Sequence, residues 1–215
     1  MTSSSIEDLR WWQQAHPTEE ELLQSGGLLV EDWPHARYVV RLSRALFEAT
    51  RPLHKLDEHA WLLLERAAFL HNAGMMVEER QHHKHSYRLI KATPLPGFSE
   101  SERHEIACIA RYHRRALPSK EHEEFAILKP SARKLVSTLA ALLRVADALD
   151  YNHDGRVLGL VADEEECTKG IWTLDLRVRP LADLDEELIH AYAKADLFEK
   201  VFKRKLRLKV HAQER

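Results

Sequence analysis

Apolar residues recur at spacings of three and four over residues 17–150, which is the period of helices that bury one face. The predicted helices begin near Pro17, near Pro34, after Asp57, near Glu78, after Ser99 and near Ser131. Ser99 and Glu102 form a capping-box pattern, and Gly74 is expected to end the helix that Asp57 caps. The sequence therefore predicts a helical bundle over residues 1–154.

The period changes to two after the turn-like sequence at residues 152–155. Residues 157–161 form a short apolar run, and apolar and polar residues alternate from Trp172 to Val178, as in a half-buried strand. An amphipathic helix is predicted from Leu184 to Phe202, and alternation returns at residues 206–210. We expect a small α+β subdomain over residues 155–215, so the predicted fold class is mainly α with this appendage.

Composition narrows the possible functions. The chain has 215 residues, enough for one ordinary domain or one domain with an appendage, and it carries 14 histidines but 7 glycines. So few glycines argue against a glycine-rich phosphate loop. A formal charge of −2 gives no global field for polyanions, so nucleic acid is not an expected partner.

Other features predict the compartment. No apolar run approaches the ~18 residues that a membrane helix needs, and residues 1–14 do not have the layout of a signal peptide. Cys108 and Cys167 show no CxxC spacing, which disfavours zinc-finger and disulfide scaffolds. We expect a cytoplasmic protein with no membrane partner.

Polar residues stand where the helical period calls for apolar ones. The five residues are His35, His71, His85, His113 and Asp147, one on each of five predicted helices. A single inward histidine is usually hydrogen-bonded in a core, but a buried carboxylate is costly unless it is paired or binds metal. Imidazole and carboxylate are suitable ligands for divalent metals, and bundle cores hold such sites. The pattern favours a functional cluster.

Two basic stretches are candidate anion sites. Arg111, Arg114 and Arg115 surround His113, and Lys84 precedes His85. Guanidinium groups match phosphate oxygens, so these residues are candidate phosphate ligands; the alternative is a solvated helix end. The second stretch, residues 200–209, holds six basic residues, and here we favour a solvated face of a terminal helix and strand.

The motifs resemble the HD superfamily, and more narrowly the C-terminal HD-type domain of the exopolyphosphatase / guanosine pentaphosphate phosphohydrolase family. The residues that carry the resemblance are His35, Leu70-His71-Asn72-Ala73-Gly74, Lys84-His85-Ser86, Gly97-Phe98-Ser99, Arg111-Tyr112-His113-Arg114-Arg115 and the stretch from Leu143 to Asp150. The resemblance implies an HD-type bundle. It also implies a divalent metal (Mn, Fe, Zn, Ni or Mg) on His35, His71-Asn72 and Asp147, with His85 and His113 completing a second site or moving protons.

Two departures from that family matter. The doublet is His71-Asn72 where HD enzymes have His-Asp, and a neutral amide supplies no bridging charge. The doublet's second position varies in the exopolyphosphatase branch, where this domain is not the catalytic one. The family's catalytic actin-like domains are also not matched, so we expect a stand-alone version of the accessory domain.

Two functions are therefore expected from the sequence. One is an HD-type metal-dependent phosphohydrolase that acts on a nucleotide or another phosphoester. The other is a non-catalytic module that binds polyphosphate or a guanosine polyphosphate, or that forms a homodimer. In both cases the expected partner is a phosphorylated small molecule or polyphosphate.

Overall fold

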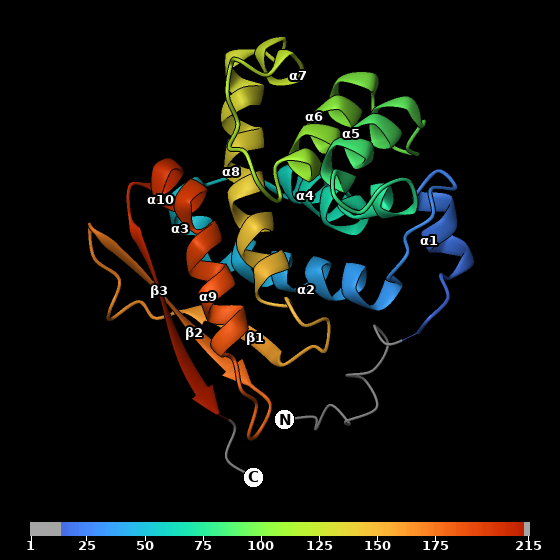
Figure 1. Ribbon diagram of the computed structural model, residues 1–215. Coiled ribbons are helices and arrows are strands. Elements are labelled where there is room, and N and C mark those ends of the chain that lie inside the picture. The colour runs from blue at the N-terminus through green and yellow to red at the C-terminus, as the bar shows by residue number, and fades with distance from the viewer. Residues whose placement is uncertain (1–13, 213–215) are drawn as a thin grey trace.

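The computed structural model describes residues 14–212, and it confirms a mainly helical protein with a small sheet (Figure 1). Its elements are α1 (Glu19–Gln24), α2 (Trp33–Ala49), α3 (Arg51–His54), α4 (Glu58–Leu70), the 3-10 helix η3 (Ala73–Met76), α5 (His82–Ala92), α6 (Glu100–Arg111), α7 (Glu123–Ala126), α8 (Pro130–Ala148), β1 (Val157–Ala162), β2 (Ile171–Val178), α9 (Asp185–Lys194), α10 (Asp196–Phe202) and β3 (Lys205–Ala212).

Helix α8 occupies the middle of the helical part, with α2, α4 and α6 packed against it (Figure 1). The sequence signals for these helices are seen in the structure. Asp57 caps α4 by accepting from the amide of Ala60, and Ser99 and Glu102 form the capping box of α6. These helices bury a continuous apolar core, in which Leu46, Leu64 and Leu143 are fully enclosed.

Gly74 has a different role from the one predicted. Helix α4 ends at Leu70, and Gly74 lies four residues later in η3. A Cβ atom at this position would lie 2.2 Å from the carbonyl oxygen of His82 and 2.5 Å from the amide nitrogen of Ser86. Glycine is therefore needed because η3 packs directly on the backbone of α5, and not because it ends a helix.

Helix α5 begins at His82, four residues later than predicted. The residues before it, from Val77 onward, form turns. This later start puts His82 and His83 in the buried first turn, while His85 stays half-buried.

The sheet has the order β1-β2-β3, with β1 and β2 antiparallel and β2 and β3 parallel. The parallel pair requires a crossover, which α9 and α10 supply. The single helix predicted over residues 184–202 is thus two helices, because Ala195 ends α9 and precedes α10.

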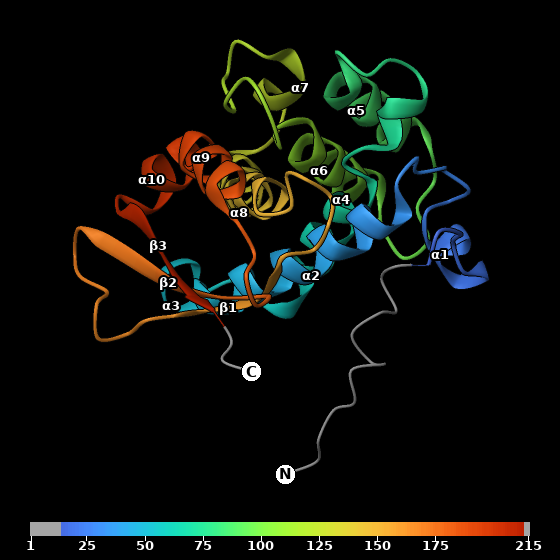
Figure 2. The ribbon, with the colours of Figure 1, turned by 60° about the horizontal axis from the view of Figure 1, so that its bottom comes forward.

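The sheet and the crossover helices pack on the bundle (Figure 2). Strand β1 lies along α2, where Tyr38 and Arg41 donate to the carbonyl oxygens of Val157 and Leu158. Helices α9 and α10 lie along α8. One buried apolar cluster extends through both parts, from Leu46 of α2 to Leu174 of β2 and Phe198 of α10.

Two further sequence interpretations have a counterpart in the structure, and a third does not. Among the described residues, the helices are too short or too polar to cross a bilayer. The stretch assessed for a signal peptide, apart from residue 14, lies outside the described residues. The basic residues of β3 are exposed or half-buried, and they pair with acids: Lys205 with Glu199, Arg207 with Glu166, and the half-buried Lys209 with Asp163. This pairing fits the solvated face that the sequence favoured.

Candidate metal centre

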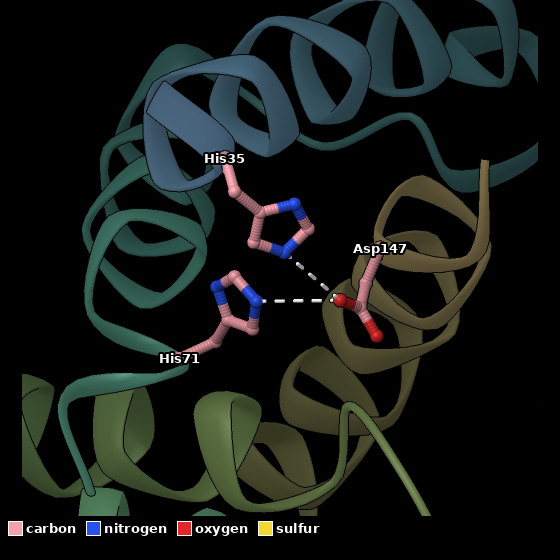
Figure 3. A group of neighbouring side chains, drawn as sticks. All are labelled: His35, His71 and Asp147. Carbon is pink, nitrogen blue, oxygen red and sulfur yellow. Dashed lines mark ion pairs between the residues drawn. The ribbon is translucent and has the colours of Figure 1, made fainter. Parts of the chain in front are cut away.

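His35, His71 and Asp147 meet in the interior from three different elements (Figure 3). His35 lies in the first turn of α2, His71 is the C-cap of α4, and Asp147 is in the last turn of α8. Their candidate ligand atoms all lie within 4.8 Å of one another. The helical period that placed each residue on an inward face thus brings them to one point.

Both imidazoles turn the same nitrogen toward the same oxygen. Nε2 of His35 lies 3.4 Å from Oδ1 of Asp147, and Nε2 of His71 lies 3.3 Å from that atom (Figure 3). Two ligands about 2.1 Å from a tetrahedral ion lie about 3.4 Å apart. The observed spacings therefore suit donors that share one ion better than they suit direct hydrogen bonds.

The other ring nitrogens fix the orientation of the rings. Nδ1 of His35 lies 2.8 Å from Oδ2 of Asp150, and Nδ1 of His71 lies 2.6 Å from the carbonyl oxygen of Ala68. Both Nε2 atoms are buried and have no hydrogen-bond partner within the described part of the chain. Unpartnered nitrogens that face a carboxylate fit a bound cation, so the residues present suit a divalent metal.

Asp147 is the negative centre of this group. Burial alone would raise the pKa of its carboxyl, but Lys194, His35 and His71 outweigh burial and hold the pKa well below its usual range. Lys194 comes from the end of α9 and donates to Oδ2, the oxygen that the histidines do not face. Asp147 is therefore ionised and offers Oδ1 to a metal.

The two histidines differ in charge. Burial disfavours a charged His35, but Asp147 and Asp150 outweigh burial and raise the pKa of His35 to about 9. Burial lowers the pKa of His71, and the attraction of Asp147 does not reverse the shift. Without metal at neutral pH, His35 holds a proton that a metal would have to displace, while His71 is a ready ligand.

A second pair of histidines adjoins the first group. The ring of His113 lies 5.0 Å from that of His71, and its Nε2 lies 3.1 Å from Nε2 of His82. Burial keeps the pKa of His113 well below its usual range and lowers that of His82 to about 4. Near neutral pH, these two rings are uncharged.

The structure does not place every predicted residue in this group. His85 lies 3.3 Å from Glu78 near the surface, and His82 is the residue that meets His113. Asn72 lines a hollow of about 440 Å³ beside Asp32 and His153, and its side-chain oxygen is buried with no partner among residues 14–212. Asn72 is thus next to the site and retains an unused ligand atom.

The predicted phosphate ligands also separate. Arg111 pairs with Glu124, which neutralises it. Arg114 lies 3.2 Å from Nδ1 of His82, so its charge borders the histidine pair. Arg115 is exposed, with a left-handed backbone at φ 57°, and Lys84 is half-buried. Of these four residues, Arg114 is the one that contacts the histidine pair, and Arg115 is the most exposed.

The family comparison agrees with the sequence motifs. Residues 29–190 match the model of the Ppx/GppA phosphatase family, domain III. The chain belongs to the Ppx/GppA phosphatase family. The matched residues include His35, His71 and Asp147, and they end four residues before Lys194.

Curated relatives of this Ppx/GppA chain share a name. A guanosine-5'-triphosphate,3'-diphosphate pyrophosphatase from Pseudoalteromonas translucida is 35% identical over 96 residues, which are 45% of this chain and 18% of the relative. Proteins of the same name from Photobacterium profundum and Vibrio cholerae are each 28% identical, over 56% and 61% of this chain and 24% and 26% of their own lengths. The chain therefore spans about a quarter or less of these relatives.

Sequence reasoning missed three residues of this Ppx/GppA site: Asp150, His82 and Lys194. Asp150 stands in the motif at the end of α8, and its three-residue spacing from Asp147 was a usable signal. His82 could have been found only with the true start of α5. Lys194 lies at the end of α9, an amphipathic helix of the crossover, and nothing in the sequence indicates that α9 reaches the site.

Proposed function

We propose that the domain is an HD-type metal-dependent phosphohydrolase acting on a nucleotide or another phosphorylated small molecule in the cytoplasm. The observation that carries the proposal is the pair of unpartnered Nε2 atoms, on His35 and His71, that face one oxygen of Asp147. This donor set has two imidazole nitrogens and one carboxylate oxygen, so it suits Mn, Fe, Zn or Ni. Mg, which prefers oxygen ligands, is the least suited of the metals expected from the sequence.

The residues around the donor set have separate tasks. A bound divalent ion would polarise a phosphoryl group and lower the pKa of a water molecule. Asp150 orients His35, and the carbonyl of Ala68 orients His71, so that each would present Nε2 to an ion held beside Asp147. His113 adjoins His71 and is assigned to proton transfer, with His82 as its neighbour.

Phosphate binding is assigned to Arg114 and Arg115. Arg114 borders the histidine pair, and Arg115 is exposed next to it. Arg111 and Lys84, also predicted from the sequence, would act less directly, since Arg111 is already paired with Glu124. The name of the relatives suggests that the phosphorylated molecule is a guanosine polyphosphate, and polyphosphate is a second candidate.

A binding module is the alternative function. Asn72 supplies no charge where HD enzymes have an aspartate, and Lys194 already neutralises Asp147. On this alternative, the domain would hold polyphosphate or a guanosine polyphosphate without turnover, or would form a homodimer. The alternative predicts ligand binding that is independent of metal.

Metal analysis of protein purified without chelator tests the proposal. We expect about one divalent ion per chain, loss of that ion in His71→Ala, and retention in His59→Ala, whose histidine is exposed and pairs with Glu102. Hydrolysis of guanosine and inorganic polyphosphates is then measured with added metal and with chelator. A wild-type chain that carries no ion and takes none up would contradict the metal centre, whereas an ion without hydrolysis would favour the binding module.

A further inference from the structure

We propose that Lys194, contributed by the crossover helix α9, binds the phosphoryl group of the substrate and makes the site selective for a phosphate dianion. This inference rests on the proposed function, because it takes the ligand of the metal site to be a phosphorylated molecule. It assigns the anion specificity of that site to a residue outside the sequence motifs. Neither the metal donors nor the arginine-rich motif includes Lys194.

Lys194 and a bound ion would use different oxygens of one carboxylate. Nζ of Lys194 contacts Oδ2 of Asp147, while Oδ1 faces the nitrogens of His35 and His71. The ammonium group therefore does not occupy the position between the three donors. It has three hydrogens, so it can keep its bond to Asp147 and still donate to an oxygen of a ligand on the ion.

Lys194 is also the most accessible member of the group. The side chains of His35 and His71 are 1% and 0% exposed and that of Asp147 is 12% exposed, whereas that of Lys194 is 21% exposed. The histidines thus form the floor of the site, and Lys194 lies toward solvent. A ligand that reaches the donor group from solvent comes within range of its ammonium.

The position of Lys194 is fixed by its backbone. The carbonyl oxygen of Lys194 accepts from Nε of Arg144 at 3.3 Å, and Asp196, two residues later, accepts from the same guanidinium at 2.9 Å. Arg144 is 3% exposed and also donates to the carbonyl oxygens of Tyr112 and Arg115. One buried arginine therefore holds both Lys194 and the loop that carries Arg114.

The charged groups around Asp147 leave a need for an anion once a metal is present. Asp147 faces His35 and His71 with one oxygen and Lys194 with the other, and Arg114 borders the adjoining histidine pair. A divalent ion would add two positive charges beside these two cations, and a phosphoryl dianion carries the charge that would balance the ion.

Calorimetric titration with inorganic phosphate tests Lys194 on the full chain, both loaded with Mn²⁺ and metal-free. We expect Lys194→Met to weaken phosphate binding to the loaded chain by about tenfold to a hundredfold, the usual effect of a lost charge-assisted hydrogen bond. Lys194→Arg should restore binding to within about threefold. Lys200→Met, which removes an exposed lysine from α10, is the matched control and should bind as the wild type does.

Metal affinity and thermal unfolding of each variant are measured beside the titration. Lys194→Met should retain the ion, because Lys194 is not among its donors. A folded Lys194→Met chain that binds phosphate as tightly as the wild type would overturn the proposal, as would a wild-type chain that binds no phosphate in either form. If the wild type takes up no ion, the proposed function is contradicted instead. The role of Lys194 is then decided by comparing phosphate binding to the metal-free wild type with phosphate binding to metal-free Lys194→Met.

Discussion

The imidazole of His35 and the carboxylate of Asp150 form a buried pair, with 2.8 Å between Nδ1 and Oδ2. The second oxygen of Asp150 accepts from the amide of Gly155 at 2.9 Å, so the carboxylate is held from both sides. A carboxylate behind a ligating histidine fixes the ring and makes the outer nitrogen a stronger donor. Asp150 therefore prepares His35 for a metal that it does not itself contact.

Replacing Asp150 tests this relationship. We expect Asp150→Asn to weaken metal binding by about tenfold to a hundredfold, because the amide still accepts from His35 but carries no charge. Asp154→Asn is the control, since Asp154 pairs with Arg156 at the surface. Titration with Zn²⁺ and Mn²⁺ gives the affinities. Equal affinity in the wild type and in Asp150→Asn would show that the carboxylate does not support the metal site.

Metal affinity should depend steeply on pH. Burial opposes a charged His35, but the neighbouring carboxylates of Asp147 and Asp150 raise its pKa to about 9, so the metal must displace a proton at neutral pH. We expect the affinity to rise by about tenfold per pH unit from pH 7 to 8 and to level off near pH 9. Calorimetry in two buffers of different ionisation enthalpy should show about one proton released per ion. An affinity that is constant over this range would contradict the assignment of His35 as a ligand.

His83 predicts an acid-sensitive fold. Burial first, and then the neighbouring His82 and Arg111, lower the pKa of His83 from 6.5 to about 4. Below pH 6.5 the unfolded chain binds this proton and the folded chain does not, so stability falls as the pH drops toward 4. Relative to the wild type, His83→Phe should gain about 1–2 kcal/mol in the free energy of unfolding between pH 8 and pH 5.

Urea unfolding at pH 8 and pH 5 measures the effect of His83→Phe. The difference between the two pH values cancels any constant packing change that phenylalanine causes. His59→Phe, at an exposed histidine, should show no comparable change. Parallel pH profiles for His83→Phe and the wild type would contradict a neutral, buried His83.

One methyl group added at Gly74 should destabilise the fold strongly. A Cβ atom would meet backbone atoms of α5 at 2.2 and 2.5 Å, so Gly74→Ala must push η3 away from α5. We expect a loss of about 3 kcal/mol in the free energy of unfolding. Gly170→Ala is the control, because nothing lies within 4 Å of its Cβ position. Comparable unfolding midpoints for the two variants would show that the contact of η3 with α5 is not tight.

Gly74→Ala should also disturb the metal centre. The amide of Gly74 donates to Oγ of Ser86 at 2.9 Å, and this hydroxyl donates to the carbonyl oxygen of His71 at 2.6 Å. A displaced η3 would therefore move the backbone of His71.

The parts of the site that the sequence predicted are those that follow a regular helix. His35 and Asp147 lie on buried helical faces, and His71 continues the face of α4 by one step, so the 3.6-residue period found them. The run of residues 82–85 shows where the period fails. His82 and His85 are three residues apart and point only about 60° apart on a helix, so periodicity alone does not decide which of them meets His113.

The remaining contacts depend on how distant segments pack. Nothing near Arg111 in sequence indicates that Glu124 neutralises it, and nothing near Lys194 indicates that α9 docks on α8. The strands were predicted because alternation is local, but the break at Ala195 was not, because the apolar period continues through it. Local periodicity thus predicted the donors, and tertiary packing determined their charge and their neighbours.

The contact between Lys194 and Asp147 also ties the metal centre to the crossover. The donors come from α2, α4 and α8, whereas the lysine comes from α9, which follows β1 and β2 in the chain. If α9 did not dock on the bundle, Asp147 would lose its lysine and keep only the two histidines as partners. The charge of the centre therefore depends on the correct docking of the last third of the chain.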